Sequence, residues 1–169
     1  MSSRPVELRP PTLADVETVT GYYFRAWQSN LAHLFTPGAL DEIPEALVVE
    51  RRTIFATWFG GADGHRSVLA VGSDDDVPFG HVTVIGDELL HLFIDPAAQG
   101  GGAGKALLTA GEEMIASDGH ARARLMTLVG NDAAVAFYAR HGWSPTGHQV
   151  IATYFGEPQV EQELTKPLT

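Results

Sequence analysis

Apolar and polar residues along the chain follow two different periods, which indicates that helices and strands alternate. Behind Thr12, apolar side chains recur every three or four positions, as on one side of an amphipathic helix, and Asp15 stands at the capping-box position. Later in the chain, three short runs rich in β-branched residues are separated by an acidic turn and by Gly86-Asp87, which is typical of an antiparallel meander. The predicted strands cover residues 6–9, 66–71, 77–85, 88–94, 122–129, 143–150 and 159–164, and the predicted helices cover residues 12–28, 44–59, 102–117 and 131–141.

Two finer predictions follow from the positions of single residues. Gly80 is expected at a β-bulge, and Gly111 is expected to let its helix approach the sheet closely. Simple alternation along the fourth strand puts Glu88, Leu90, Leu92 and Ile94 on one face and Leu89, His91 and Phe93 on the other.

Composition then excludes several classes of function. With 169 residues, the chain is expected to form one domain, residues 1–169, that is large enough to bury a core. The formal net charge of −10 argues against nucleic acid as a partner, and it suits a cationic acceptor as well as simple solubility. No apolar run reaches the roughly 20 residues of a membrane span, and no signal-peptide core follows the first residues. Since cysteine is absent, disulfides and a cysteine nucleophile are excluded, and a cytoplasmic protein without a membrane partner is expected.

The clearest chemical signal is a glycine-rich stretch between a predicted strand and a predicted helix. In that order, free backbone N–H groups and the positive end of a helix dipole meet at one point, which is suited to a phosphate. A Walker A loop would need glycine where Gln99 stands and Ser or Thr where Ala106 stands, and no frame of the glycines gives G-x-G-x-x-G. The spacing that fits is Q-x-x-G-x-G, formed by Gln99, Gly102 and Gly104.

This stretch resembles the pyrophosphate-binding loop of the GNAT superfamily of acyl-CoA-dependent N-acetyltransferases. Its lead-in from Leu92 to Pro96 and its exit from Gly104 to Leu108 fit the same family. Residues 131–143 resemble a second family motif, N-x-x-A-x-x-F-Y-x-x-x-G-[FW]. The resemblance implies an α/β (α+β) fold with a single mixed, largely antiparallel sheet flanked by helices, and the predicted order βααβββαβαββ matches it.

The resemblance also implies how acetyl-CoA would bind. The pyrophosphate would be held on the backbone N–H groups of the loop, which comprises Gln99, Gly100, Gly101, Gly102, Ala103, Gly104 and Lys105. In this family the strand before the loop splays from its neighbour, so the backbone of Leu92, Phe93 and Ile94 would pair with the pantetheine amides. Asn131 would cap its helix and hydrogen-bond near the pantetheine arm. Lys105 is explained equally well as an ordinary surface lysine.

For the chemistry, the resemblance implies that Tyr138 donates a proton to the departing thiolate, with a buried structural tyrosine as the alternative. Glu88 is the first candidate for the general base, followed by His91 and then His81. Without a cysteine, direct transfer from acetyl-CoA to an amine of a small molecule or peptide in a ternary complex is expected. No zinc-ligand spacing occurs among the seven histidines, so no metal site is expected.

Three points remain open from the sequence. The first concerns the aromatic residues of the first helix, which either fill the core or line the acceptor pocket. In the family, the segment after this helix borders that pocket. The residues are Tyr22, Tyr23, Phe24 and Trp27. Dimers are common in the family, so a homodimer is one expected assembly. A non-catalytic CoA-binding sensor or assembly module is the alternative function.

Overall fold

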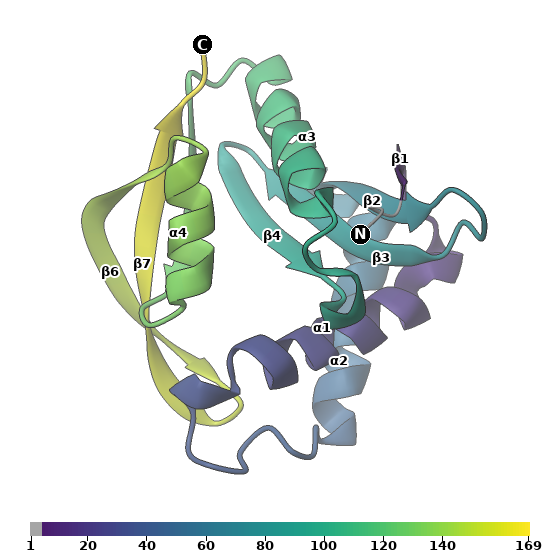
Figure 1. Ribbon diagram of the computed structural model, residues 1–169, viewed down its shortest axis with the longest axis vertical. Coiled ribbons are helices and arrows are strands. Elements are labelled where there is room, and N and C mark those ends of the chain that lie inside the picture. Colours follow the sequence, from purple (N-terminus) through teal and green to yellow (C-terminus); the bar gives the residue numbers. More distant parts are fainter. Residues whose placement is uncertain (1–4) are drawn as a thin grey trace.

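The computed structural model describes residues 5–169, which form a seven-stranded sheet with helices on both faces (Figure 1). The strands are β1 (Val6–Arg9), β2 (Arg66–Gly72), β3 (Pro78–Ile85), β4 (Glu88–Ile94), β5 (Arg122–Leu128), β6 (Ser144–Tyr154) and β7 (Glu157–Pro167), and the helices are α1 (Val16–Asn30), α2 (Glu45–Phe59), α3 (Ala103–Ser117) and α4 (Asp132–Arg140). The order along the chain is βααβββαβαββ, as predicted. Within the described residues, no helix is both long enough and apolar enough to cross a membrane.

The sheet has the order β1-β2-β3-β4-β5-β7-β6, and the pairing of β4 with β5 is its one parallel pairing among the described strands. Hairpin turns join the antiparallel neighbours β2, β3 and β4, whereas α3 carries the chain back across the sheet from β4 to β5. A parallel pair needs such a crossover connection. The predicted mixed, largely antiparallel sheet is therefore confirmed.

Local signals at both ends of the chain decide where elements begin and end. The predicted capping box is present before α1, where the Thr12 N–H donates a hydrogen bond to Asp15 Oδ2 at 2.8 Å.

The predicted ends of the last two strands were wrong, because the hairpin extends to a tight turn. Phe155 and Gly156 form that turn with φ values of 50° and 77°, so β6 and β7 are longer than their hydrophobic patterns predicted.

Each face of the sheet has its own hydrophobic cluster and its own pair of helices. α1 and α2 pack around Tyr22 and Phe55 on one face, and α3 and α4 pack around Leu107 on the other. Successive residues of β2 point to opposite clusters, since Leu69 belongs to the first and Ala70 to the second. The sheet is thus covered on both faces over its central strands.

β4 departs from simple alternation at Leu90. In the ladder with β3, His91 and Leu89 pair with consecutive β3 residues, so that Leu90 is the extra residue of a β-bulge. Leu89 therefore packs in the α3 cluster, while Leu90 packs against the α1–α2 cluster. The faces predicted for the residues before the bulge, including Glu88, were wrong, because one extra residue reverses the face of everything preceding it.

Both predicted roles of glycine agree with the structure. The ladder between β2 and β3 pairs Gly80 with Ala70 and then skips Phe79, so the irregularity falls directly beside Gly80. A Cβ on Gly111 would lie 2.9 Å from Val82 Cγ2. A side chain at that position would therefore push α3 away from the sheet.

This close approach predicts opposite effects for two glycine substitutions within helices. Gly111→Ala is expected to destabilise the protein by about 1 kcal/mol, because overpacking of about 1–3 kcal/mol outweighs a helix-propensity gain of roughly 1 kcal/mol. Gly21→Ala in α1 is the matched control, since its Cβ would meet only the flexible end of Arg25 at 3.2 Å, and it is expected to stabilise. Urea unfolding of both variants is the measurement. An equal gain in both would contradict the tight packing of α3.

Candidate active site

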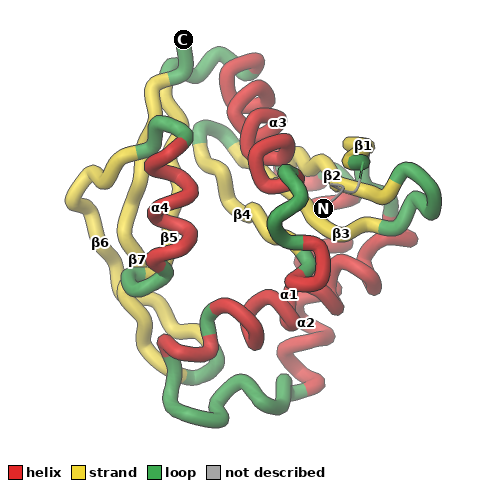
Figure 2. The backbone as a smooth tube through the Cα atoms, viewed as in Figure 1, coloured by secondary structure: helices red, strands yellow, loops and turns green. Residues whose placement is uncertain are grey.

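β4 and β5 are neighbours in the sheet but separate along most of their length. Within the described chain their ladder holds a single pair, Glu88 with Arg124, and Figures 1 and 2 show β4 diverging from the strands beyond it. A cavity of about 820 Å³ lies there, lined by residues 88–94 of β4 and 125–128 of β5. Its size falls within the range of small-molecule sites. The β4 backbone that faces β5 is therefore available to pair with a ligand.

The loop between β4 and α3 presents an uncapped helix N-terminus (Figure 2). Gly100 and Gly102 have φ values of 88° and 85°, a left-handed conformation that glycine adopts without steric cost. The first hydrogen bond of α3 runs from Ala106 N to Gly102 O, and no side chain in residues 5–169 caps this end. The preceding N–H groups, at residues 103–105, can therefore bind an anion such as a pyrophosphate.

The predicted loop residues do not all face the same space. Gln99 and Gly104 line the cavity, and Gln99 Nε2 donates a hydrogen bond to Ile94 O at 3.4 Å. Lys105 lies instead at a separate shallow depression on α3, and Ala103 is buried. Lys105 therefore does not line the main cavity.

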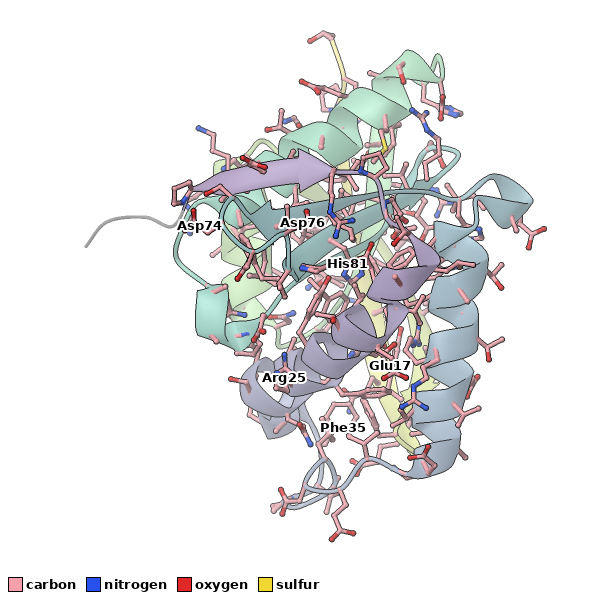
Figure 3. The ribbon with its side chains drawn as sticks, turned by 90° about the vertical axis from the view of Figure 1, so that its right-hand side faces the viewer. Glu17, Arg25, Phe35, Asp74, Asp76 and His81 are labelled. Carbon is pink, nitrogen blue, oxygen red and sulfur yellow. The ribbon has the colours of Figure 1, made fainter. Side chains whose placement is uncertain are left out.

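An ion pair fixes the start of this loop to α1. Arg25 Nη2 donates to Asp95 Oδ2 at 2.9 Å, and Asp95 Oδ1 accepts the backbone N–H of Ala97 at 3.1 Å (Figure 3 labels Arg25). One carboxylate therefore both holds the short turn after β4 and ties it to the helix that crosses behind it.

The residues predicted to contact the pantetheine arm lie together on the cavity. Leu92, Phe93 and Ile94 form its β4 wall, and Asn131 lines it from the start of α4. Asn131 Oδ1 accepts a hydrogen bond from Ala134 N at 3.4 Å, so the capping role expected of it is present.

Tyr138 projects from α4 into the same cavity, although it is 8% exposed. Its ring packs edge-on against Trp143, with 5.9 Å between ring centroids, and Trp143 Nε1 in turn donates to Glu112 Oε1. Burial raises the pKa of the Tyr138 hydroxyl. The phenol therefore stays protonated and can serve as a proton donor.

Glu88 also lines the cavity, at the position where β4 and β5 still pair. It is half-buried, and its Oε2 is 3.4 Å from Arg124 Nη2. Burial raises the pKa of Glu88, while Arg124 opposes that rise. A carboxylate with a raised pKa is a stronger base than one in water, so Glu88 suits proton removal.

A hydrogen-bonded chain of three side chains, Tyr22, His81 and His91, runs from the core to the cavity wall. Tyr22 Oη lies 2.6 Å from His81 Nδ1, and His81 Nε2 lies 3.3 Å from His91 Nδ1. His91 lines the cavity, whereas His81 is fully buried where α1 crosses the sheet (Figure 3). Burial lowers the pKa of His81 to about 3 and also lowers the pKa of His91. Both imidazoles are therefore neutral at physiological pH.

The cavity also contains charged residues that the sequence analysis did not single out. Arg51 of α2 and Glu161 of β7 both line it, and the Tyr154 hydroxyl donates a hydrogen bond to Glu161. Both lie outside the two motifs that carry the resemblance, and in the sequence they look like ordinary surface charges. Tyr23 and Trp27, for which core and pocket were both considered, are buried and line the cavity as well.

Replacing His81 with Gln is expected to weaken the dependence of stability on pH. Because the pKa of His81 falls from 6.5 to about 3 on folding, the unfolded chain binds the extra proton between those values. The stability that His81 contributes is fully present above its pKa in the unfolded chain, and it is lost as the pH falls toward its pKa in the folded protein. For one such histidine the loss between about pH 7.5 and about pH 5.5 is about 1 kcal/mol.

Urea unfolding at these two pH values measures the effect. The exposed His148 supplies the matched control, since His148→Gln should keep the full loss of the wild-type protein while His81→Gln loses less. The same loss in all three proteins would contradict a buried neutral His81.

Comparisons with known proteins agree with this geometry. The acetyltransferase (GNAT) domain family matches residues 62–155, more than half of the chain. Among solved structures, a GCN5-related N-acetyltransferase from Rhodopseudomonas palustris is similar, with a TM-score of 0.74, 20% identity and coverage of 99% of this chain and 99% of that chain. The PaiA N-acetyltransferase from Thermoplasma acidophilum, in complex with coenzyme A, has a TM-score of 0.73 at 19% identity and covers 96% and 99%.

A third similar structure is a phosphinothricin acetyltransferase from Sinorhizobium meliloti in complex with acetyl-CoA, with a TM-score of 0.72, 20% identity and coverage of 96% of this chain and 88% of that chain. No curated protein sequence gives a significant match. At these identities the likeness to solved structures shows the fold, and the domain match shows the family. The chain belongs to the GNAT family of acetyltransferases.

Proposed function

We propose that this protein is an N-acetyltransferase that moves the acetyl group of acetyl-CoA to a primary amine of a small molecule or peptide. The observation that carries the proposal is the separation of β4 from β5, with a cavity between them and an uncapped α3 N-terminus beside it. Two of the similar structures hold coenzyme A or acetyl-CoA, which supports the same cofactor here.

Each part of acetyl-CoA has a matching feature. The pyrophosphate is an anion, and the loop from Gln99 to Lys105 offers backbone N–H groups at a helix N-terminus. The pantetheine arm carries two amides, and the unpaired backbone of β4 at residues 92–94 offers the donors and acceptors to match them, as an added strand would. With the pyrophosphate at the loop that follows Ile94, the arm would run back along β4, and the thioester would lie between the bulge at Leu90 and α4, within reach of Tyr138.

The transfer is direct, because the chain has no cysteine to carry the acetyl group. Glu88 takes a proton from the ammonium form of the acceptor, either directly or through water, and the freed amine attacks the thioester carbonyl carbon. The new C–N bond forms as the C–S bond breaks. Backbone N–H groups of β4 stabilise the developing oxyanion, and Tyr138 donates its proton to the departing thiolate. The second proton on the attacking nitrogen then passes through water to the Tyr138 phenolate, which restores the acid and leaves a neutral amide.

Removing the proposed acid tests this assignment. Tyr138→Phe is expected to lower kcat by about 10²- to 10⁴-fold, the usual contribution of a positioned acid, while the affinity for acetyl-CoA stays nearly unchanged. Thiol release from acetyl-CoA with a panel of amines measures the rate, and calorimetry measures the affinity. Full activity in the variant would show that another group protonates the thiolate. An absence of binding heat with the wild-type protein would overturn the proposed function itself.

The proposed base predicts a pH dependence. Glu88→Gln is expected to lower kcat/KM by about 10²-fold and to remove its fall on the acid side. In the wild-type protein kcat/KM should rise with pH through a pKa above the ordinary carboxyl value, because burial raises the pKa of Glu88. Asp87→Asn is the matched control, since Asp87 also pairs with Arg124 but does not line the cavity. An acid limb that persists in Glu88→Gln would assign the base elsewhere.

A further inference from the structure

One part of the cavity, lined by α1 and α2, contains a cation that has no direct ion-pair partner among the described residues. Arg51 of α2 is half-buried there, and its guanidinium carbon lies 4.7 Å from the ring centroid of Tyr23 and 5.7 Å from that of Phe55. Within residues 5–169, no carboxylate lies within 4.0 Å of it. The adjacent Arg52, in contrast, pairs with Glu17 at 2.8 Å.

Aromatic contacts do not use the hydrogen-bonding capacity of a guanidinium. Its five N–H groups point outward in the plane of the group, whereas an aromatic ring attracts the cation through its face. Arg51 is partly withdrawn from water, so its N–H donors gain stability from a partner that accepts hydrogen bonds in the plane of the guanidinium. A carboxylate is a planar anion with that geometry.

A second buried donor lies in the same region. Trp27 is 5% exposed and lines the cavity, and its indole Nε1 has no hydrogen-bond partner among the described residues. Burial raises the pKa of the Tyr23 hydroxyl, and the nearby Arg51 and Trp27 both oppose that rise. The guanidinium and the indole N–H are thus both close to the Tyr23 oxygen. Tyr23 Oη is near enough to accept from both groups, but one phenol oxygen cannot match the five guanidinium N–H groups and the indole N–H, so this concentration of donors points to a further acceptor group that a ligand brings.

The two glutamates that line the cavity do not form a direct ion pair with Arg51. Glu88 stands at the junction of β4 and β5, and Glu161 lies on β7, where it accepts the hydrogen bond of Tyr154. These carboxylates suit an ammonium group, while Arg51 suits an anion. Phe93 and Trp27 add aromatic surface to the same cavity.

We propose that the acceptor is an amino acid-type molecule. Its carboxylate binds to Arg51, Trp27 and Tyr23, and its amine lies near Glu88. This inference rests on the proposed N-acetyltransferase function and narrows its substrate class. A simple alkylamine or polyamine would satisfy the glutamates but would leave the Arg51 guanidinium without a partner.

Pairs of acceptors that differ only in the carboxylate test the inference. Each α- or ω-amino acid, with phenylalanine and γ-aminobutyrate among them, is compared with its carboxamide, and kcat/KM is measured by thiol release from acetyl-CoA. For the amino acid that the wild-type protein acetylates best, kcat/KM is expected to exceed that of the matching carboxamide by at least about tenfold, as a charge-assisted bidentate contact would give. In Arg51→Gln that ratio should fall close to one. Because both proteins see the same two acceptors, differences in amine basicity cancel.

Two further variants separate recognition from folding. Arg52→Gln lies next to Arg51 on α2 but pairs with Glu17 between the two helices (Figure 3 labels Glu17), so it should keep the wild-type ratio. Arg51→Lys keeps the charge without the planar fork and should restore part of the preference. The thermal midpoint and the affinity for acetyl-CoA are measured for every variant, and Arg51→Gln should match the wild-type protein in both.

The outcomes separate this inference from the function on which it rests. Amides acetylated as well as acids, or an acid-to-amide ratio that survives in Arg51→Gln, would overturn the carboxylate site and leave the acetyltransferase intact. Binding of acetyl-CoA without thiol release from any amine would overturn both. A preference that collapses only in Arg51→Gln would support the site.

Discussion

The separation of β4 from β5 is the feature on which the rest of this structure depends. Two parallel neighbours that stay hydrogen-bonded would leave no cavity, no free backbone and no route from one face of the sheet to the other. Here one ladder pair, Glu88 with Arg124, holds the strands together, and the next residues of β4 face a cavity. Unpaired backbone groups are costly when buried, so the gap is stable only if it stays wet or if a ligand pairs with it.

Antiparallel pairing and packing hold the strands on each side of that gap. α3 can lie close to β3 and β4 because Gly111 has no side chain, which fixes β4 to its antiparallel neighbours. On the far side of the gap, β5 is held by β7 and by the packing of Leu125 and Leu164 around α4. The gap thus lies between two strands that are each held by antiparallel neighbours, while the cluster around Leu107 spans both halves of the sheet.

The sequence predicted what depends on local chemistry. The order of elements, the Thr12 cap and the glycine loop all follow from short-range spacing, and the structure agrees with them. The sequence did not predict the bulge at Leu90, because an extra residue within an apolar run does not visibly change the pattern of apolar and polar residues. Arg51 and Glu161 were missed for a related reason: only tertiary packing brings two ordinary charges from α2 and β7 to one cavity.

The hydrogen bonds of His81 and His91 bear on which candidate residue can act as the general base. The Tyr22 hydroxyl is fully buried and, within the described residues, has His81 as its hydrogen-bond partner, so it donates its proton to His81 Nδ1. His81 then carries its own proton on Nε2 and donates it to His91 Nδ1, which leaves His91 protonated on Nε2. A ring in that tautomer offers the cavity a donor and no lone pair. Reversing the chain would leave the Tyr22 proton without an acceptor. This tautomer argument supports Glu88, rather than His81 or His91, as the base in the proposed mechanism.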